Sequence, residues 1–411
     1  MLVYVREIHD CRYGYPFVMV LLILIILLFF SVLSYWYTRS AVHPAFITST
    51  LWLILILVYS LIPHGLYPLS AKFYYAIALW CIPFCSCALI FSKFRFAVPA
   101  YFTYSCPNIK LFNKIGPILL VTNALLIVAF NTLAADYGTN IVSGLRNVFM
   151  YSPEEVPRQI SLLMYLSVFG IVTVITYMYT PVTRTIKYKL LTFSSLIILM
   201  CLGNKGGIAG PAFAVLFMQY FYGKLNWKKI VVFLLIVIGL MTAMVLIRAD
   251  AGGVTLADYI IIYTLSPLPA FDMLLNHDLT VLPATVGTAT FGSFFKVLHA
   301  LGLDASVVPF VPPDWAYVPL PTNVFTHMYS FYLDFGYGGI MAFAIFFGSA
   351  WGILYNLMKR HIRLFVTVYA LFFHSLLLSF FADFVFTFMS LSIQYLFIVH
   401  LLYLRFKFRP A

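Results

Sequence analysis

The stretch FVMVLLILIILLFFSVL, residues 17–33, decides the fold class, because it is long, apolar and free of charge. A helix that crosses a bilayer needs about 20 apolar residues, with a range of roughly 17–25. The run is longer than the core of a signal peptide, and the bulky residues Tyr35, Trp36 and Tyr37 follow it where a cleavage site would need small side chains. We therefore expect it to remain in the protein as a transmembrane anchor.

The composition of the whole chain agrees with this interpretation. Of the 411 residues, 63% are hydrophobic and only 9% are charged, whereas soluble domains have about 45–50% and about 25%. These values exclude a soluble multidomain enzyme and a disordered scaffold. The six cysteines form no CxxC pair and show no metal-ligand spacing, so a disulfide-stapled domain is excluded as well. The sequence predicts an all-α polytopic integral membrane protein.

Further apolar runs define the remaining spans. We predict about 11 transmembrane helices, within a range of 10–13, at 16–36, 45–62, 73–92, 115–134, 161–180, 190–203, 206–222, 230–247, 338–357, 364–381 and 384–404. The two spans at 190–203 and 206–222 are short and interrupted by glycine and proline, which also fits a re-entrant hairpin.

Lysine and arginine set the orientation, because they are enriched in cytoplasmic loops. An odd number of spans with a cytoplasmic C-terminus places 17 of the 25 basic residues inside and all 13 acidic residues outside. The inner set is Arg39, Lys93, Arg95, Lys110, Lys114, Arg184, Lys187, Lys189, Lys224, Lys228, Lys229, Lys359, Arg360, Arg363, Arg405, Lys407 and Arg409. The net charge of +12 is thus explained by topology, and no nucleic-acid partner is expected.

Residues 1–411 are predicted to form a single membrane domain with two long outer segments. The first periplasmic loop covers 135–160, and a large periplasmic loop region covers 248–337. Long ordered loops in compact proteins tend to be functional. The apolar stretches 258–275 and 285–301 within the second segment are interrupted by proline, aspartate or lysine, which favours short interfacial or re-entrant helices.

The segment 322–339, TNVFTHMYSFYLDFGYGG, carries the first group of candidate site residues. On a helix, Asn323, His327, Ser330 and Asp334 would fall on one face. They could simply form the hydrated face of an interfacial helix. They could also form a polar site that faces an outer cavity, since ionisable groups at membrane depth are often functional.

The second group consists of the few cations on the predicted outer side. Arg146, Lys205 and Arg248 are candidates for binding a phosphate, Arg158 is a further one, and snorkelling to lipid headgroups is the alternative for each. Asp383, at the start of the last span, is a second carboxylate with possible acid or base chemistry. We identify no metal-ligand set, and HExxH, Walker A and GxSxG motifs do not occur.

Several short motifs give the chain a resemblance to a known family. They are HP at 43–44, GLRN at 144–147, NKGGI at 204–208, TFG at 290–292, PTNVFTHMYSFYLDFGYGGI at 321–340 and SFFADF at 379–384. In order and spacing the chain resembles bacterial oligosaccharide repeat unit polymerases, the Wzy-type O-antigen and capsule polymerases.

The resemblance implies a GT-C-like membrane glycosyltransferase of the Gram-negative inner membrane, acting on its periplasmic face. Such an enzyme moves a growing glycan from undecaprenyl diphosphate onto a lipid-linked repeat unit, without a cofactor or metal. A chain-length regulator and a flippase are further candidate partners. In this setting Arg146, Lys205 and Arg248 would stabilise the diphosphate, and His327, Asp334 or Asp383 would act as base. Asn323, Tyr329 and Arg158 would contact the substrate.

Two other functions remain open on the sequence alone. An O-antigen ligase would use the same kind of donor but transfer the glycan to lipid A core. A lipid-linked oligosaccharide flippase or other transporter is the alternative from a different class, although such proteins often show repeated halves, and the outer loops here are concentrated late in the chain.

Overall fold

The part of the chain that the structure describes consists mainly of helices. A computed structural model describes residues 14–98, 106–138, 141–152, 155–202, 205–233, 235, 239, 256–277, 285–300, 302 and 315–404. In this part of the chain the only strands are β1 (Ala316–Tyr317) and β2 (Pro321–Thr322), which pair antiparallel with Ala316 opposite Thr322. The prediction of an all-α membrane protein is confirmed.

Six of the described helices are long and apolar enough to cross a membrane. On the first of them, Leu21, Ile25 and Phe29 are each more than half exposed. A row of large apolar side chains facing outward suits hydrocarbon and not water. The six helices are α1 (Gly14–Thr38), α2 (Pro44–Leu61), α3 (Ala71–Phe91), α5 (Ile109–Ala135), α7 (Arg158–Tyr177) and α14 (Met328–Lys359).

Four more of the predicted spans coincide with shorter helices. These are α8 (Ile186–Leu202), α9 (Lys205–Phe221), α15 (Arg363–Leu377) and α16 (Met389–Tyr403), none of which exceeds 17 residues. The range 230–247 lies largely outside the described residues. The count of eleven spans therefore stays a prediction.

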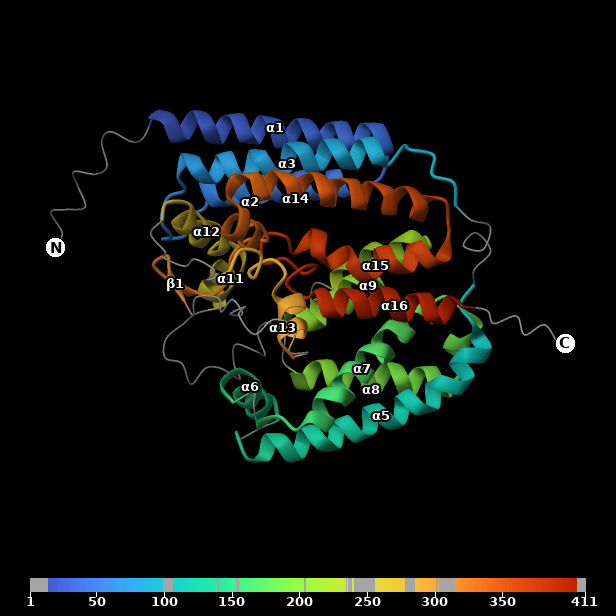
Figure 1. The fold of residues 1–411 in the computed structure, drawn as a ribbon. Coiled ribbons are helices and arrows are strands. Elements are labelled where there is room, and N and C mark those ends of the chain that lie inside the picture. Colours follow the sequence, from blue (N-terminus) through green and yellow to red (C-terminus); the bar gives the residue numbers. More distant parts are fainter. Residues whose placement is uncertain are drawn as a thin grey trace. The chain divides into compact units, whose positions relative to one another are not determined.

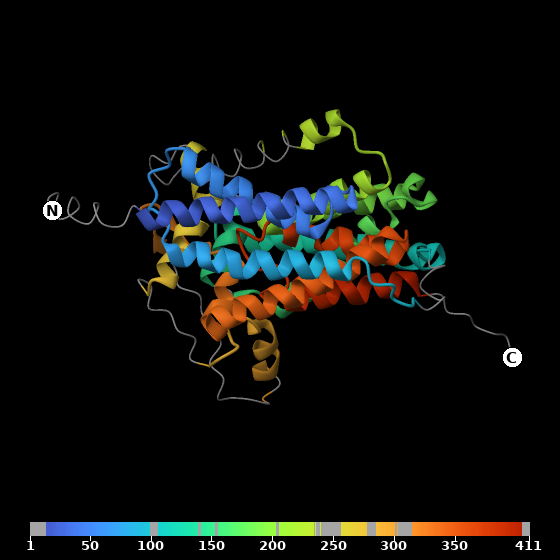
Figure 2. The ribbon, with the colours of Figure 1, turned by 90° about the horizontal axis from the view of Figure 1, so that it is seen from above.

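The residues group into two compact units. Unit 1 contains 1–96, 254–356 and 375–390, and unit 2 contains 97–253, 357–374 and 391–411. In unit 1, α1, α2, α3 and α14 lie side by side with their axes roughly aligned (Figures 1 and 2). The segment predicted as the large outer loop contributes the short helices α11 (Leu256–Thr264), α12 (Pro267–Leu275) and α13 (Gly292–Ala300).

Two glycines allow α14 to approach α3 closely. A Cβ atom added at Gly348 would lie 2.4 Å from the carbonyl oxygen of Phe84, and one added at Gly352 would lie 2.7 Å from that of Ala88. Glycines four residues apart place two helix backbones in direct contact, as is common in membranes. The sequence GSAWG at 348–352 therefore fixes this helix pair.

We expect Gly348→Ala to lower the thermal stability of the detergent-purified protein by about 1–3 kcal/mol, because the added methyl group forces α3 and α14 apart. Gly338→Ala is the matched control, since Gly338 lies in the same helix and a Cβ atom there meets no neighbour within 4 Å. Equal melting temperatures for the two variants would show that the close approach does not stabilise the fold.

Unit 2 is organised around α5, which packs against α7 and α8 (Figure 1). Helix α6 (Ile141–Tyr151) packs on the end of α5, and the 3-10 turn η2 (Pro181–Arg184) leads into α8. Inside this group the Asn123 amide donates to the hydroxyls of Ser194 at 2.9 Å and Ser195 at 3.2 Å. One apolar core cluster of the unit consists of Leu126, Phe130, Ala134, Leu145, Ile160 and Ile198.

Candidate functional site: a buried histidine in an aromatic pocket

His327 is fixed at the start of α14 by two contacts with one residue. Its backbone N–H donates to the carbonyl oxygen of Ser379 at 2.9 Å, and its Nδ1 lies 2.5 Å from the same oxygen. The side chain is only 5% exposed, and the Trp80 ring meets it edge to face with centroids 4.0 Å apart. The imidazole is thus held in one orientation.

These contacts determine which nitrogen of His327 carries the proton. A carbonyl oxygen can only accept a hydrogen bond, so Nδ1 must be the donor. Nε2 then carries the lone pair, and it has no hydrogen-bond partner among the described residues. Burial lowers the pKa of His327 to about 3, against the hydrogen bond to Ser379, which raises it. The ring is therefore neutral at physiological pH and offers one free acceptor atom.

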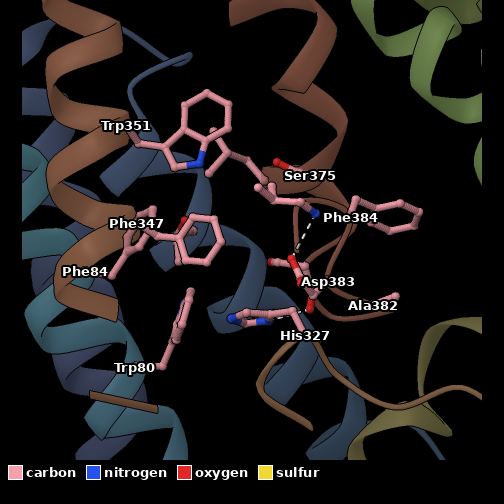
Figure 3. A pocket seen from close by; sticks show the side chains of 13 residues that line it. Trp80, Phe84, His327, Phe347, Trp351, Ser375, Ala382, Asp383 and Phe384 are labelled. Atoms are coloured by element: carbon pink, nitrogen blue, oxygen red, sulfur yellow. Dashed lines mark hydrogen bonds between the residues drawn. The ribbon is translucent and has the colours of Figure 1, made fainter. Parts of the chain in front are cut away.

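A pocket in unit 1 surrounds this imidazole. It encloses about 350 Å³ of space not filled by atoms, part of it open to the outside. Figure 3 shows aromatic rings on one side and the segment that carries Asp383 on the other, with His327 between them. The lining residues are Thr48, Trp80, Phe84, His327, Phe347, Trp351, Ser375, Leu376, Ser379, Ala382, Asp383, Phe384 and Val385.

Asp383 lines the same pocket, but its carboxylate is engaged by its own loop. The oxygens accept the backbone N–H groups of Val385, Phe386 and Thr387, each at 2.9 Å. Burial raises the pKa of Asp383, and these hydrogen bonds oppose the shift. The carboxylate therefore shapes the turn at 383–387, and its residue lines the pocket.

Asp334 also binds backbone amides, at a different place in unit 1. Its carboxylate accepts N–H groups from Gly287 at 2.9 Å, Ala289 at 3.4 Å and Thr290 at 2.6 Å. It is 9% exposed. The carboxylate thereby ties α14 to the turn that precedes α13, and the motifs around 290–292 and 334–336 meet through this contact.

The helix expected in the segment 322–339 is wrong at its start, whereas the stop expected at Gly336 coincides with a break in the helix. Residues 323–327 are not helical, because Pro321 and Thr322 belong to β2 and the His327 backbone is bonded to Ser379. Helix α14 starts at Met328. It is kinked at Gly336, whose φ of 60° and ψ of −152° lie outside the helical region, and it continues beyond this residue to Lys359. Ser330 and Asp334 share a helix face; Asn323 and His327 precede the helix.

The structure brings only some of the predicted site residues together. His327 and Asp383 share the pocket, whereas Asn323 is exposed and Tyr329 stacks on Phe325 with ring centroids 4.4 Å apart. None of the candidate cations is among the described residues that line this pocket. Unit 2 contains Arg146 on α6, the exposed Arg158 at the start of α7 and Lys205 at the start of α9; Arg248 lies outside the described residues.

Sequence reasoning missed the aromatic wall of the pocket and the hydroxyl of Ser379. Trp80 lies on α3 and Trp351 on α14, far from the polar motifs in sequence. Near His327 the hydroxyls of Thr326, Ser330 and Ser379 are buried and have no partner among the described residues. Only the recurrence of short polar motifs at 322–330 and 379–383 could have indicated that these segments meet.

No group of three metal-ligating side chains occurs within the described part of the chain. The polar groups that line the pocket are an imidazole, a carboxyl group and several hydroxyls, beside indole and phenyl rings. No protein-family model, no curated protein and no solved structure matches this chain.

Proposed function

We propose that the protein is a Wzy-type polymerase of the Gram-negative inner membrane, with its active site facing the periplasm. It transfers a growing glycan from undecaprenyl diphosphate onto a lipid-linked oligosaccharide repeat unit. The observation that carries this proposal is the buried His327 with a free Nε2 in an aromatic pocket. Such an atom accepts a hydrogen bond from a sugar hydroxyl, and aromatic rings pack against sugar rings.

The pocket is small relative to a lipid-linked oligosaccharide. Its roughly 350 Å³ include space that is open to the outside. We assign it to the part of the acceptor sugar that carries the reacting hydroxyl. The remaining glycan and both polyprenyl chains would lie outside it.

In the proposed reaction the acceptor hydroxyl oxygen forms a bond to the anomeric carbon of the donor glycan. The bond from that carbon to the phosphate oxygen breaks, and its electron pair leaves with undecaprenyl diphosphate. His327 Nε2 accepts the hydroxyl proton. Arg146, Lys205 and Arg248 remain our candidates for stabilising the charge on the diphosphate, because fixed cations in a water-poor site stabilise developing charge better than water does.

The low pKa of His327 leads to a testable prediction about how the reaction rate depends on pH. In the free protein the ring is neutral above about pH 3, so His327 should produce no acidic limb near pH 6.5 in kcat/KM. Rates of glycan extension measured from pH 4.5 to 8 test this prediction. A kcat/KM limb at pH 6–7 that His327→Gln removes would contradict the assignment.

Deletion of the gene tests the function itself. A polymerase mutant keeps lipid A core bearing one repeat unit and loses the long ladder on a gel of surface polysaccharide. Loss of every repeat unit would instead indicate a ligase or a flippase. Extension of an undecaprenyl-linked glycan by the purified protein is the direct biochemical test, and failure to extend any such substrate would reject the proposal.

A further inference from the structure

Unit 2 contains a second hollow, separate from the His327 pocket and not used by the proposed reaction. It is a shallow hollow with about 220 Å³ of space not filled by atoms, part of which is open to the outside. The residues that line it come from the start of α5, the ends of α7, α9 and α16 and the start of α15. They are Pro107, Thr176, Tyr179, Thr180, Met218, Tyr222, Arg363, Thr367 and Tyr403. Five helix ends therefore meet at one place in the unit.

The charge at this hollow is positive. Arg363 is its one charged lining residue, and no carboxylate lines it. Lys224 lies against the lining residue Tyr179, with its Nζ 5.3 Å from the ring centroid, and Lys229 Nζ donates to the Lys224 carbonyl oxygen at 2.6 Å. A guanidinium without a carboxylate in its pocket favours a ligand that brings its own negative charge.

The hollow also contains hydroxyl groups that can donate hydrogen bonds. Thr367 and Tyr403 hydroxyls lie 3.0 Å apart and are hydrogen-bonded to each other. Tyr179 and Tyr222 also line the hollow, and their phenol O–H groups can donate hydrogen bonds. One guanidinium with several O–H donors around it is a set that suits phosphate oxygens.

The sequence pattern places this hollow at the basic surface of the membrane protein. In the sequence, each lining segment lies within four residues of a basic residue of the predicted inner set. These basic residues are Lys110, Arg184, Lys224, Arg360 and Arg405. None of the 13 acidic residues is predicted on this side. Basic pockets between helices at the cytoplasmic surface bind the head groups of anionic lipids.

We propose that this hollow binds the phosphate group of an anionic phospholipid at the cytoplasmic membrane surface, with Arg363 as the bidentate partner. The lipid phosphate would bridge the ends of α7, α9, α15 and α16. The proposal does not depend on the polymerase reaction, so it stands or fails independently of the function proposed above.

The test uses the full-length protein purified in detergent, with bound lipid measured by native mass spectrometry during titration. The probes are phosphatidylglycerol, phosphatidylcholine and inorganic phosphate. We expect selective retention of phosphatidylglycerol and an increase in its dissociation constant of at least about tenfold in Arg363→Lys, because lysine keeps the charge but lacks the planar fork. Arg184→Lys is the matched control, since Arg184 is exposed on the same predicted surface and does not line the hollow.

Each outcome decides the proposal. Equal affinities of Arg363→Lys and the wild type would mean that only general surface charge attracts the lipid, and the proposal would fail. Equal retention of phosphatidylcholine, or saturation by inorganic phosphate alone, would also overturn the assignment to an anionic lipid. Arg363→Gln extends the series, and size-exclusion profiles and melting temperatures establish that each variant is folded.

Discussion

His327→Ala should lower the rate of glycan extension by about 100- to 10,000-fold, the range that general acid–base groups contribute. The substitution removes Nε2, the atom that we propose accepts the proton of the acceptor hydroxyl. Extension of a defined undecaprenyl-linked glycan by purified protein gives the rate, and the polysaccharide ladder of a complemented deletion strain gives the same information in cells. Protein amounts must be matched, because the Nδ1 hydrogen bond to Ser379 is lost as well.

Two further variants separate chemistry from structure. His327→Gln retains a side-chain amide donor but has no basic nitrogen, so it should be folded and nearly inactive. His64→Gln is the control: His64 is a partly buried histidine of the same unit whose nitrogens bond to the backbone of Tyr59 and Leu66. If His327→Gln extends glycans within about threefold of the wild type, a proton-accepting role is excluded.

The sequence was sufficient to predict the helical membrane fold, because spans depend on local composition. An uninterrupted apolar run such as residues 17–33 has few alternatives once it is too long for a signal peptide. Ten of the eleven predicted ranges coincide with helices in the described part of the chain. Their bounds were less predictable: α16 begins only at Met389, because the Asp383 carboxylate holds the preceding residues 385–387 in a turn.

The candidate site was only partly predictable, because its parts meet through tertiary contacts. His327 was identified from its polar neighbours, yet its orientation depends on Ser379, which is 52 residues away. The helical periodicity that placed it beside Asp334 was misleading, since Pro321 cannot begin a regular helix while it pairs in β2. A periodic pattern describes one helix face, whereas the pocket is assembled from α2, α3, α14, α15 and the segment 378–388.

Asp334 illustrates how the structure changes the interpretation of a predicted catalytic residue. The sequence around Asp334 is compatible with a catalytic acid or base and equally with a carboxylate that stabilises the fold. In the structure, both oxygens accept backbone N–H groups of the turn at 287–290, so they are already occupied. The hydrogen bonds also join it to a turn whose Gly287 has a φ of 92°, a conformation that the carboxylate helps to hold. We therefore expect Asp334 to stabilise the fold of unit 1 and not to transfer protons.

Asp334→Ala should accordingly destabilise the protein by about 3–5 kcal/mol, because it leaves buried backbone N–H groups without an acceptor. Against a typical total stability of about 5–15 kcal/mol, the variant should accumulate poorly and melt at a clearly lower temperature. Asp334→Asn keeps one acceptor oxygen and should lose less. Asp136→Ala, at an exposed aspartate that follows α5, is the control and should melt like the wild type. The deciding quantity is the specific activity of the folded fraction. A structural Asp334 leaves it largely intact in Asp334→Asn, whereas a catalytic Asp334 would give a stable, well-folded and inactive protein.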